Sequence, residues 1–446
     1  MTKIMRPEHP FPVTKKENGW ALIPFFVFLF FYLGLSIFAK DFYFIPMPIA
    51  FLVASASAFV LNKKATISQK MEVFAKGMGE TNIMIMCMIF ILAGAFASVA
   101  KAAGSVDAAV RISRSLVPES LILPEFFIIS CLISLGIGTS CGTIAALVPI
   151  AIGIADSGNI SPALMIGAVI GGAMFGDNMS MISDTTIAAT RTQNVEMRDK
   201  FIKNFKIALP AAIVTLIIYL FLPVEQKGNA QEITSSLTDY LLVFPYILIL
   251  IGALLNLNVM ALLFKGTFFA LIIGVALKTI SFKSGLQVIG NGTLGMAETL
   301  IVAILAGGLL ALIRHNGGIA YILKKIEKVI RGKNSCEFGI MLLVSAVNLF
   351  TANNTVAIVV AGPLAKDLSS KYKCDSRRIA SILDSASCVV QGLIPYGAQI
   401  LIAIGIAKGA NLQISTLELI GVIYYPMLLA ISLIASIIIN SLMRKQ

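Results

Sequence analysis

The sequence is dominated by apolar runs that are each long enough to cross a lipid bilayer. A transmembrane helix needs about 20 consecutive apolar residues to cover a hydrocarbon layer about 30 Å thick. Of the 446 residues, 57% are hydrophobic and 13% are charged, which is more apolar material than one water-soluble core can bury. The spanning runs cover residues 20–38, 44–61, 82–100, 162–190, 206–222, 239–256, 259–278, 298–313, 379–405 and 416–442. They predict an all-α polytopic membrane protein.

Two further apolar stretches, at 121–155 and 338–363, are interrupted at their centres by small and polar residues. Irregular backbone at membrane depth is tolerated only where it is buried in protein or lines a water-filled cavity. We therefore predict that each stretch forms a re-entrant hairpin. The polar residues at the two predicted tips are Thr139, Ser140, Asn353, Asn354 and Thr355.

The chain also contains an internal repeat. The segment Ile91–Gly94 recurs as Ile304–Gly307, at a spacing of 213 residues (304 − 91). After one inserted residue, Pro149 matches Pro363 at a spacing of 214 (363 − 149). A spacing that holds across most of each half is not expected from chance matches between small apolar residues. The sequence therefore predicts two structurally related halves.

Basic residues predict how the two halves are oriented. Cytoplasmic loops of membrane proteins are enriched in Lys and Arg, and such clusters occur at 62–80 and at 191–206, the second of which includes Lys200. Each half has five predicted spans and one hairpin, an odd number of crossings, so the second half should be inverted relative to the first. Inverted repeats are typical of secondary transporters with a site near the bilayer midplane.

These assignments divide the chain into four parts. They are a cytoplasmic segment at 1–19, a first membrane repeat at 20–222, an external linker at 223–238 and a second membrane repeat at 239–446. Both termini are predicted to be cytoplasmic, in a multi-pass protein of the cell inner (plasma) membrane.

Two carboxylates, Asp177 and Asp184, lie inside an otherwise apolar span. A charged side chain at the centre of a membrane helix costs about 2.5–3.5 kcal/mol on insertion scales. One interpretation is that these acids cap a helix end or pair with a base such as Arg191. The other is that the helix is unwound here and that its oxygen atoms bind a small hard cation such as Na⁺. The candidate ligands are Asp177, Asn178, Ser180, Ser183, Asp184, Thr185 and Thr186, with Asp177 and Asp184 as the sodium-binding carboxylates.

The repeat extends the candidate site into the second half. The spacing of 214 lays Asp177 on Gln391 (391 − 177), within a segment that contains proline and two glycines. Such a segment predicts a second broken helix that faces the first. Asp384 is a further candidate intramembrane acid; the alternative is that it lies near the cytoplasmic mouth and pairs with Arg377 or Arg378.

At these residues the chain resembles the NhaC-type sodium/proton antiporter family, part of a broader superfamily of inverted-repeat ion transporters. The family pattern Gly-Asp-x-x-Ser-Pro-x-Ser-Asp-Thr-Thr is matched by Gly176, Asp177, Ser180, Ser183, Asp184, Thr185 and Thr186. The resemblance extends loosely over both halves, and it implies that the two polar hairpin tips face the substrate. Met181 replaces the proline of the pattern. Because related carriers are associated with organic acids, amino acids or drugs, this departure leaves the substrate open.

Two functional hypotheses follow. In the first, sodium ions and protons compete for Asp177 and Asp184, and alternating access converts this competition into antiport. In the second, sodium or proton entry drives an amino acid or organic acid that binds between the two hairpin tips. The expected partners are the lipid bilayer, sodium ions and protons, with a small organic solute and a second copy of the chain as further candidates.

Other classes of function are disfavoured by composition. The chain has two histidines and its cysteines lack CxxC spacing, so it offers neither a catalytic triad nor a zinc site. We therefore expect no enzymatic activity and no cofactor. The net charge of +12 resides in short loops between apolar runs, where it sets topology, so nucleic acid is not an expected partner.

Overall fold

The computed structural model describes residues 17–35, 45–62, 65–116, 118–158, 160–181, 183–222, 236–255, 257–330 and 332–443. Within these residues all regular secondary structure is helical. Seven helical segments in this part of the chain are long and apolar enough to cross a membrane, and shorter apolar helices accompany them. The protein is therefore a polytopic membrane protein, as predicted, whereas most of the predicted linker at 223–238 lies outside the described residues.

The chain divides into two compact units. The first comprises Met1–Ile83 and Ile304–Ile330, and the second comprises Met84–Ala303 and Arg331–Gln446. The first unit thus combines segments from both predicted repeats. Its helices are η1 (Gly19–Leu22), α1 (Ile23–Leu29), η2 (Phe30–Gly34), α3 (Met47–Val60), α4 (Ile67–Met78), the C-terminal part of α15 (Ala297–His315) and α16 (Gly318–Val329).

An aromatic contact and side-chain hydrogen bonds hold the first unit together. Phe28 of α1 packs on Phe51 of α3, with ring centroids 4.2 Å apart. Helix α4 begins with a capping box, in which Thr66 and Gln69 bond each other's backbone N–H groups. The side chain of Asn62 donates to Asn316 over 2.9 Å, which ties the end of α3 to the end of α15.

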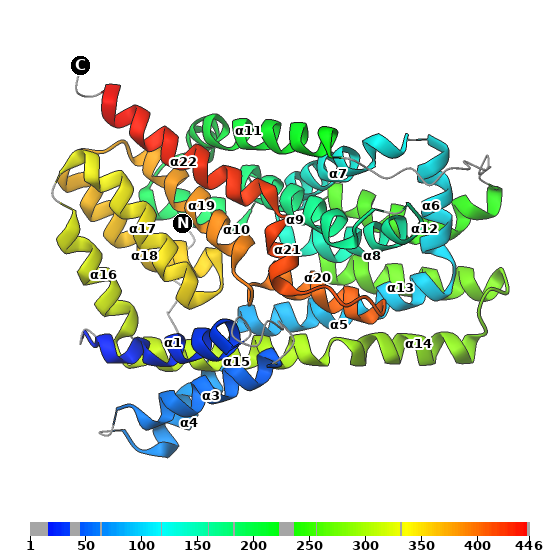
Figure 1. Ribbon diagram of the computed structural model, residues 1–446, viewed down its shortest axis with the longest axis horizontal. Coiled ribbons are helices and arrows are strands. Elements are labelled where there is room, and N and C mark those ends of the chain that lie inside the picture. The colour runs from blue at the N-terminus through cyan, green and yellow to red at the C-terminus, as the bar shows by residue number, and fades with distance from the viewer. Residues whose placement is uncertain are drawn as a thin grey trace, which may run out of the picture. The chain divides into compact units, whose positions relative to one another are not determined.

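The second unit contains the candidate functional residues. Helices α7, α8 and α9 lie side by side in it, as do α17, α18 and α19 (Figure 1). Its helices are most of α5 (Thr81–Ala102), α6 (Ser105–Leu116), η3 (Glu119–Leu121), α7 (Ile122–Ile137), α8 (Ser140–Gly158), α9 (Pro162–Met179), α10 (Asp184–Gln193), α11 (Met197–Phe221), α12 (Leu237–Leu254), α13 (Val259–Ala276), α14 (Phe282–Gly295), the start of α15, α17 (Lys333–Thr351), α18 (Asn354–Lys371), α19 (Ser376–Leu393), α20 (Ala398–Gly409), α21 (Thr416–Gly421) and α22 (Tyr424–Met443).

Both predicted hairpins turn at the expected residues. Helices α7 and α8 are separated by Gly138, whose φ of +73° is readily adopted by glycine. Helices α17 and α18 are separated at Ala352, whose φ of +48° lies in the left-handed region that non-glycine residues seldom occupy. The following residue, Asn353, caps α18 by accepting a hydrogen bond from the Val356 N–H group. The depth of the two turns in the membrane stays a prediction.

Helix boundaries repeat at the spacing found in the sequence. Helix α9 begins at Pro162 and α19 at Ser376, a difference of 214 (376 − 162), and their ends differ by the same amount (393 − 179). Helices α10 and α20 also begin 214 residues apart (398 − 184). Gly104 and Gly317, which are 213 residues apart (317 − 104), share a φ of +87°. Equivalent positions of the two halves therefore adopt equivalent local structure.

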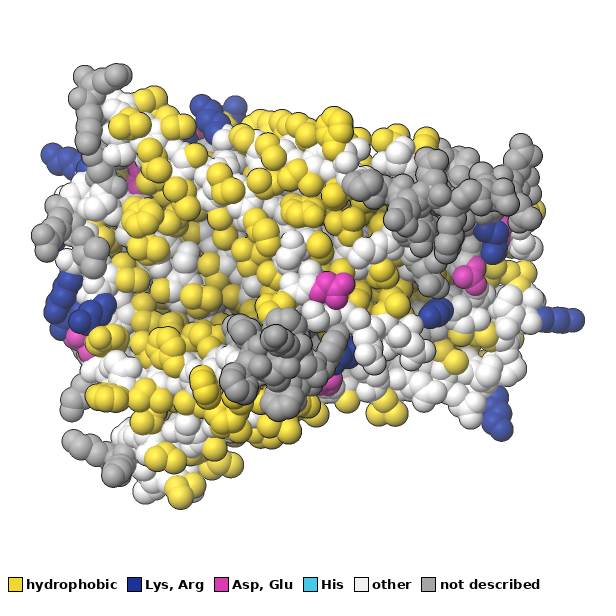
Figure 2. Space-filling model, viewed as in Figure 1, with side chains coloured by type: hydrophobic (Ala, Val, Ile, Leu, Met, Phe, Trp, Pro, Cys, Tyr) yellow, Lys and Arg dark blue, Asp and Glu magenta, His cyan; other side chains and the backbone are white. Residues whose placement is uncertain are grey.

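The exposed surface of α22 and of the C-terminal part of α11 is mostly apolar. Figure 2 shows hydrophobic side chains gathered over these helices on the visible face, and exposed members include Ile213, Ile217, Ile434 and Ile438. A contiguous apolar surface of this kind is unfavourable in water but is favourable against lipid tails. These helices thus present lipid-facing surfaces.

Helix α9 is buried along almost its whole length, and glycine allows α7 to approach it closely. A Cβ atom on Gly172 would lie 2.3 Å from the Phe127 carbonyl oxygen. We therefore expect Gly172→Ala to lower the free energy of unfolding by about 1–3 kcal/mol, because the added methyl group forces the helices apart. Thermal unfolding of the detergent-solubilised protein measures this loss.

Gly290→Ala, in α14, is the matched control for that substitution. No atom lies within 4 Å of the position that its Cβ would take, and alanine favours helix over glycine. Gly290→Ala should therefore leave the melting temperature unchanged or raise it slightly. Equal losses in the two variants would contradict the close packing of α7 on α9.

Candidate functional site

The helix that carries Asp177 is interrupted within the predicted segment. Helix α9 ends at Met179 and α10 begins at Asp184. Polar side chains satisfy backbone groups on either side of the gap. The Thr186 hydroxyl donates to the Ser180 carbonyl oxygen over 2.7 Å, and Ser183 caps α10 by accepting from the Thr185 N–H group. The interruption is therefore an ordered break with its own hydrogen bonds.

The carboxylate of Asp177 lies just before this break and is 7% exposed. Its Oδ1 atom accepts a hydrogen bond from the Ser183 hydroxyl over 2.5 Å, and its Oδ2 atom accepts one from the Ser140 hydroxyl over 2.7 Å. Ser183 comes from the far side of the break, whereas Ser140 comes from the turn between α7 and α8. Asp177 is thus held between a broken helix and a hairpin turn.

The atoms around Asp177 form an oxygen-rich cluster. The Ser183 hydroxyl also contacts the Thr185 hydroxyl at 2.9 Å, so one carboxylate and three hydroxyls adjoin one another. Among the described residues, no group of three or more His, Cys, Asp or Glu side chains gathers in a metal-binding arrangement. A single carboxylate with hydroxyl oxygens suits a hard cation of low charge rather than a transition metal.

A row of hydrogen bonds joins this cluster to the second half of the chain. Gln399, in the first turn of α20, donates from Nε2 to the Ser140 hydroxyl over 2.9 Å. Gln391 of α19 donates to Gln399 Oε1 over 2.9 Å and to the carbonyl oxygen of Ala352 over 3.1 Å. The row therefore connects both hairpin turns and both interrupted helices, and all three linking side chains are buried.

Sequence reasoning named Gln391 but missed Gln399. The signal for Gln399 was the repeat itself, because a spacing of 214 places Gln399 on Thr185 (399 − 185). Both residues are the second residue of the helix that follows a break. The repeat therefore identifies the position of Gln399 in the helix, but it does not predict which residue its side chain contacts.

A buried ion pair lies beside the break. Lys200 of α11 and Asp384 of α19 form a salt bridge in which each side chain is 1% exposed. The Lys200 ammonium also donates to the Asn178 carbonyl oxygen over 2.8 Å and to the Thr186 hydroxyl over 2.9 Å. A cation at this place is favourable because the C-terminal end of α9 carries partial negative charge.

Asn204, one turn after Lys200, holds the same region. Its amide nitrogen donates to the Asn178 carbonyl oxygen over 2.8 Å. Its amide oxygen accepts hydrogen bonds from Ser381 and Ser385, over 2.8 and 2.6 Å. Together with Lys200, it fastens the end of α9 to α11 and α19.

The ion pair identifies the partner of Asp384 and a buried member of the basic segment at 191–206. Lys200, one of the basic residues at 191–206, is buried and paired, whereas the sequence places it among loop residues; the side of the membrane on which this segment lies stays a prediction. The partner of Asp384 is Lys200, whereas Arg377 pairs with Asp375 and Arg378 pairs with Glu337. Counting basic residues along the chain does not reveal which of them are buried, because burial depends on tertiary packing.

The remaining predicted residues occupy different places. Asp184 is the first residue of α10 and its side chain is exposed, so it lies outside the buried cluster. Ser180, Thr185 and Thr186 are buried at the break, as is Asn178. Thr139 is half-buried at the first turn. At the second turn, the residues Asn353, Asn354 and Thr355 are half-buried and lie at the N-terminal end of α18.

The chain is similar in sequence to known proteins. A profile described as the Na⁺/H⁺ antiporter family matches residues 19–224 and 232–440. The chain is similar to the malate-2H(+)/Na(+)-lactate antiporter of Bacillus subtilis, at 23% identity over 83% of this chain and 84% of that protein. It is also similar to the Na(+)/H(+) antiporter NhaC of Bacillus subtilis, at 24% identity over 72% of this chain and 76% of that protein.

A solved structure also matches most of the chain. The YdaH transporter of Alcanivorax borkumensis aligns over 94% of this chain and 98% of that one, with 11% identity and a TM-score of 0.42.

Proposed function

Because the chain belongs to the Na⁺/H⁺ antiporter family, we propose that it exchanges sodium ions for protons at Asp177. The observation that supports this most strongly is the buried Asp177 carboxylate, which two serine hydroxyls hold at the break between α9 and α10. A carboxylate in so dry a place needs either a cation or a proton to neutralise it. It therefore provides one place that the two ions occupy in turn.

The contacts of Asp177 suit both occupants. With Na⁺ bound, the carboxylate and the oxygen atoms of Ser140 and Ser183 would serve as ligands, and the hydroxyl hydrogens would turn away from the ion. With a proton bound, one carboxyl oxygen would become a donor to a neighbouring hydroxyl. Because one charge neutralises the site in either state, binding of one ion expels the other. Alternating access to the two sides of the membrane converts this exclusion into antiport.

In the proposed membrane arrangement, the second half of the chain is inverted relative to the first. It supports exchange because two halves related by inversion can expose one central site to either side. The equal spacing of helix boundaries in the two halves supports it, as do the basic clusters at 62–80 and 191–206, which are typical of cytoplasmic loops. We accordingly place both termini in the cytoplasm and the protein in the inner membrane, with five spans and one re-entrant hairpin in each half.

Reconstitution into proteoliposomes tests this function. With a pH-sensitive dye inside and an acidic lumen, addition of external Na⁺ should raise the internal pH, because each entering ion displaces a proton outward. Choline at the same concentration should give no signal, because this large cation cannot be coordinated by the carboxylate and hydroxyl oxygens. Parallel additions of Li⁺ and K⁺ establish the cation preference. A sodium signal no larger than the choline signal would rule out sodium/proton exchange.

The second candidate is coupled transport of an organic acid. It is favoured by the similarity to a protein named for malate and lactate. The test is radiolabelled lactate or malate uptake into the same proteoliposomes, with and without a sodium gradient. Uptake that depends on the gradient would support this function, and its absence alongside a sodium-dependent pH signal would leave cation exchange as the activity.

A further inference from the structure

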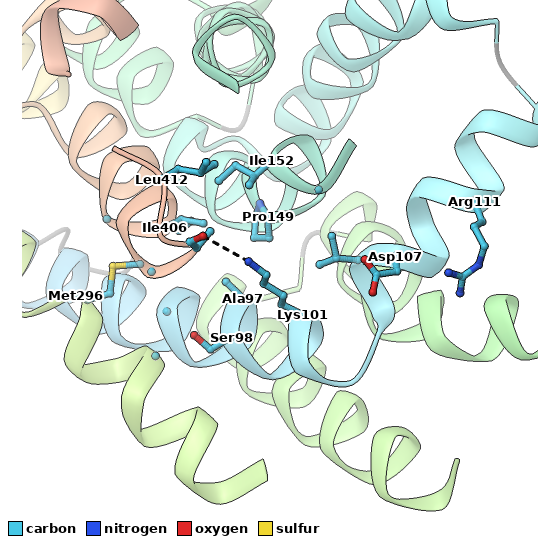
Figure 3. Close-up of a pocket in the computed structure, with 17 residues that line it drawn as sticks. Ala97, Ser98, Lys101, Asp107, Arg111, Pro149, Ile152, Met296, Ile406 and Leu412 are labelled. Atoms are coloured by element: carbon cyan, nitrogen blue, oxygen red, sulfur yellow. Dashed lines mark hydrogen bonds between the residues drawn. The ribbon is translucent and has the colours of Figure 1, made fainter. Parts of the chain in front are cut away.

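The second unit contains a cavity that is separate from the Asp177 cluster. Its volume is about 430 Å³, within the range of small-molecule sites, roughly 300–1,000 Å³. It is lined by α5, α6, α8, α14 and α20, by Met296 between α14 and α15, and by the segment after α20 (Figure 3). Because glycine has no side chain, glycines in the wall leave space and expose backbone atoms to the cavity. The five are Gly94, Gly153, Gly292, Gly405 and Gly409.

The cavity lies along the same two helices that carry part of the hydrogen-bond row. On α8, Pro149 lines it nine residues after Ser140, and on α20, Ile406 lines it seven residues after Gln399. At 1.5 Å per residue these separations correspond to roughly 10–14 Å along the helices. A molecule in the cavity would therefore not contact Asp177, although α8 and α20 contribute residues to both sites.

Two charged side chains of opposite sign face this space. Lys101, at the end of α5, extends into it, and Asp107 of α6 lies across from it (Figure 3). The Lys101 ammonium makes only a long hydrogen bond of 3.4 Å, to the carbonyl oxygen of Ala410. Both side chains are exposed to the space.

The third charged residue of the wall is already neutralised. Arg111 binds Asp239 through two nitrogen atoms, at 2.5 and 3.1 Å, and Asp239 comes from α12. Figure 3 shows Arg111 on the far side of Asp107 from Lys101. Asp107 interacts electrostatically with Arg111, but the hydrogen bonds of Arg111 go to Asp239, which leaves the Lys101 ammonium and the Asp107 carboxylate to bind a ligand.

We infer that this cavity binds a small α-amino acid, with its carboxylate at Lys101 and its ammonium group at Asp107. A zwitterion satisfies both side chains at once, whereas a simple carboxylate satisfies Lys101 and is repelled by Asp107. The Ser98 hydroxyl, also in the wall, is a further partner for the carboxylate. The glycines leave room for a short side chain and the methylene groups of Met296 offer it an apolar contact. This inference goes beyond cation exchange and does not depend on it.

L-alanine and L-lactate form a matched pair of probes, because they differ chiefly by an ammonium group in place of a hydroxyl. Binding to the purified full-length protein is measured by isothermal titration calorimetry at constant Na⁺. We expect L-alanine to bind at least about tenfold more tightly than L-lactate, as a lost charge-assisted hydrogen bond implies. Tighter binding of L-lactate, or no binding of either, would overturn the assignment.

Two variants separate the roles of the charged groups. Lys101→Gln should weaken L-alanine binding by at least about tenfold, since it removes the partner of the carboxylate. Asp107→Asn should remove the preference for L-alanine over L-lactate. Lys283→Gln, an exposed lysine of α14 outside the cavity wall, is the matched control and should bind as the unmodified protein does.

A purely structural role for Lys101 gives a different result. If its ammonium only caps the end of α20 through Ala410, Lys101→Gln would lower the melting temperature and leave alanine affinity unchanged. That outcome would overturn the inference. A Lys101→Arg variant, which keeps the charge, should retain alanine binding more closely than Lys101→Gln.

Discussion

Asp177→Asn abolishes sodium-dependent proton movement, reducing it to the level of protein-free liposomes, if Asp177 is the exchange site. Asparagine keeps the size of the side chain and its amide oxygen still accepts from a serine hydroxyl, so the break between α9 and α10 should persist. What it loses is the negative charge, which both Na⁺ and a proton need for binding. The proteoliposome pH assay measures this loss.

Asp184→Asn is the matched control for that substitution. Asp184 lies seven residues after Asp177 in the same motif, but its side chain is exposed and stands at the start of α10. Its replacement should remove only a favourable interaction with the helix N-terminus, worth about 0.3–1 kcal/mol, and exchange should continue near the normal rate. If Asp184→Asn were inactive and Asp177→Asn active, the ion would bind at Asp184 instead.

Lys200→Met should destabilise the protein strongly. It leaves the Asp384 carboxylate buried without its cation, and the cost of breaking such a pair is about 3–5 kcal/mol. Thermal unfolding in detergent measures the loss. Lys203→Met is the matched control, because Lys203 pairs with Asp375 at 3.3 Å with both side chains about one third exposed. Exposed pairs contribute about 0–1 kcal/mol, so this variant should melt close to the unmodified protein.

The double substitution Lys200→Met with Asp384→Leu separates charge from packing. Replacing both members of a buried pair by apolar groups is often neutral or stabilising, so the double variant should recover most of the stability lost in Lys200→Met. Equal stability of Lys200→Met and Lys203→Met would show that the pair is not buried as described. A double variant as unstable as Lys200→Met would instead assign the loss to the Asn178 and Thr186 contacts of Lys200.

The sequence predicted the helical architecture because apolar length and repeat spacing are properties of local sequence. The hairpin turns fell at Gly138 and Ala352, inside segments chosen only for their polar interruptions. The break after Asp177 followed from the cost of carboxylates in a membrane span. Each of these inferences used only residues that are close together in the sequence, or the single spacing of the repeat.

The contacts between distant segments could not be predicted in this way. Lys200 resembles its basic neighbours in sequence, and only the folded chain brings it to Asp384, which is 184 residues later (384 − 200). Likewise, Asp177 and Asp184 belong to one motif, yet the turn of the chain at Ser183 buries one and exposes the other. The partner of a buried charge depends on tertiary packing, which periodicity does not encode.

The hydrogen bonds that lead from Gln391 through Gln399 and Ser140 to Asp177 all have their donors on the same side. They form a line of dipoles with one direction, and the carboxylate at its end fixes that direction by acting only as an acceptor. A proton on the Oδ2 atom of Asp177 would make that oxygen a donor, so the Ser140 hydroxyl would turn its hydrogen away and accept from Asp177 instead. Occupancy of Asp177 would thereby be felt first at Ser140, the hydroxyl that also accepts from Gln399 in the second half of the chain.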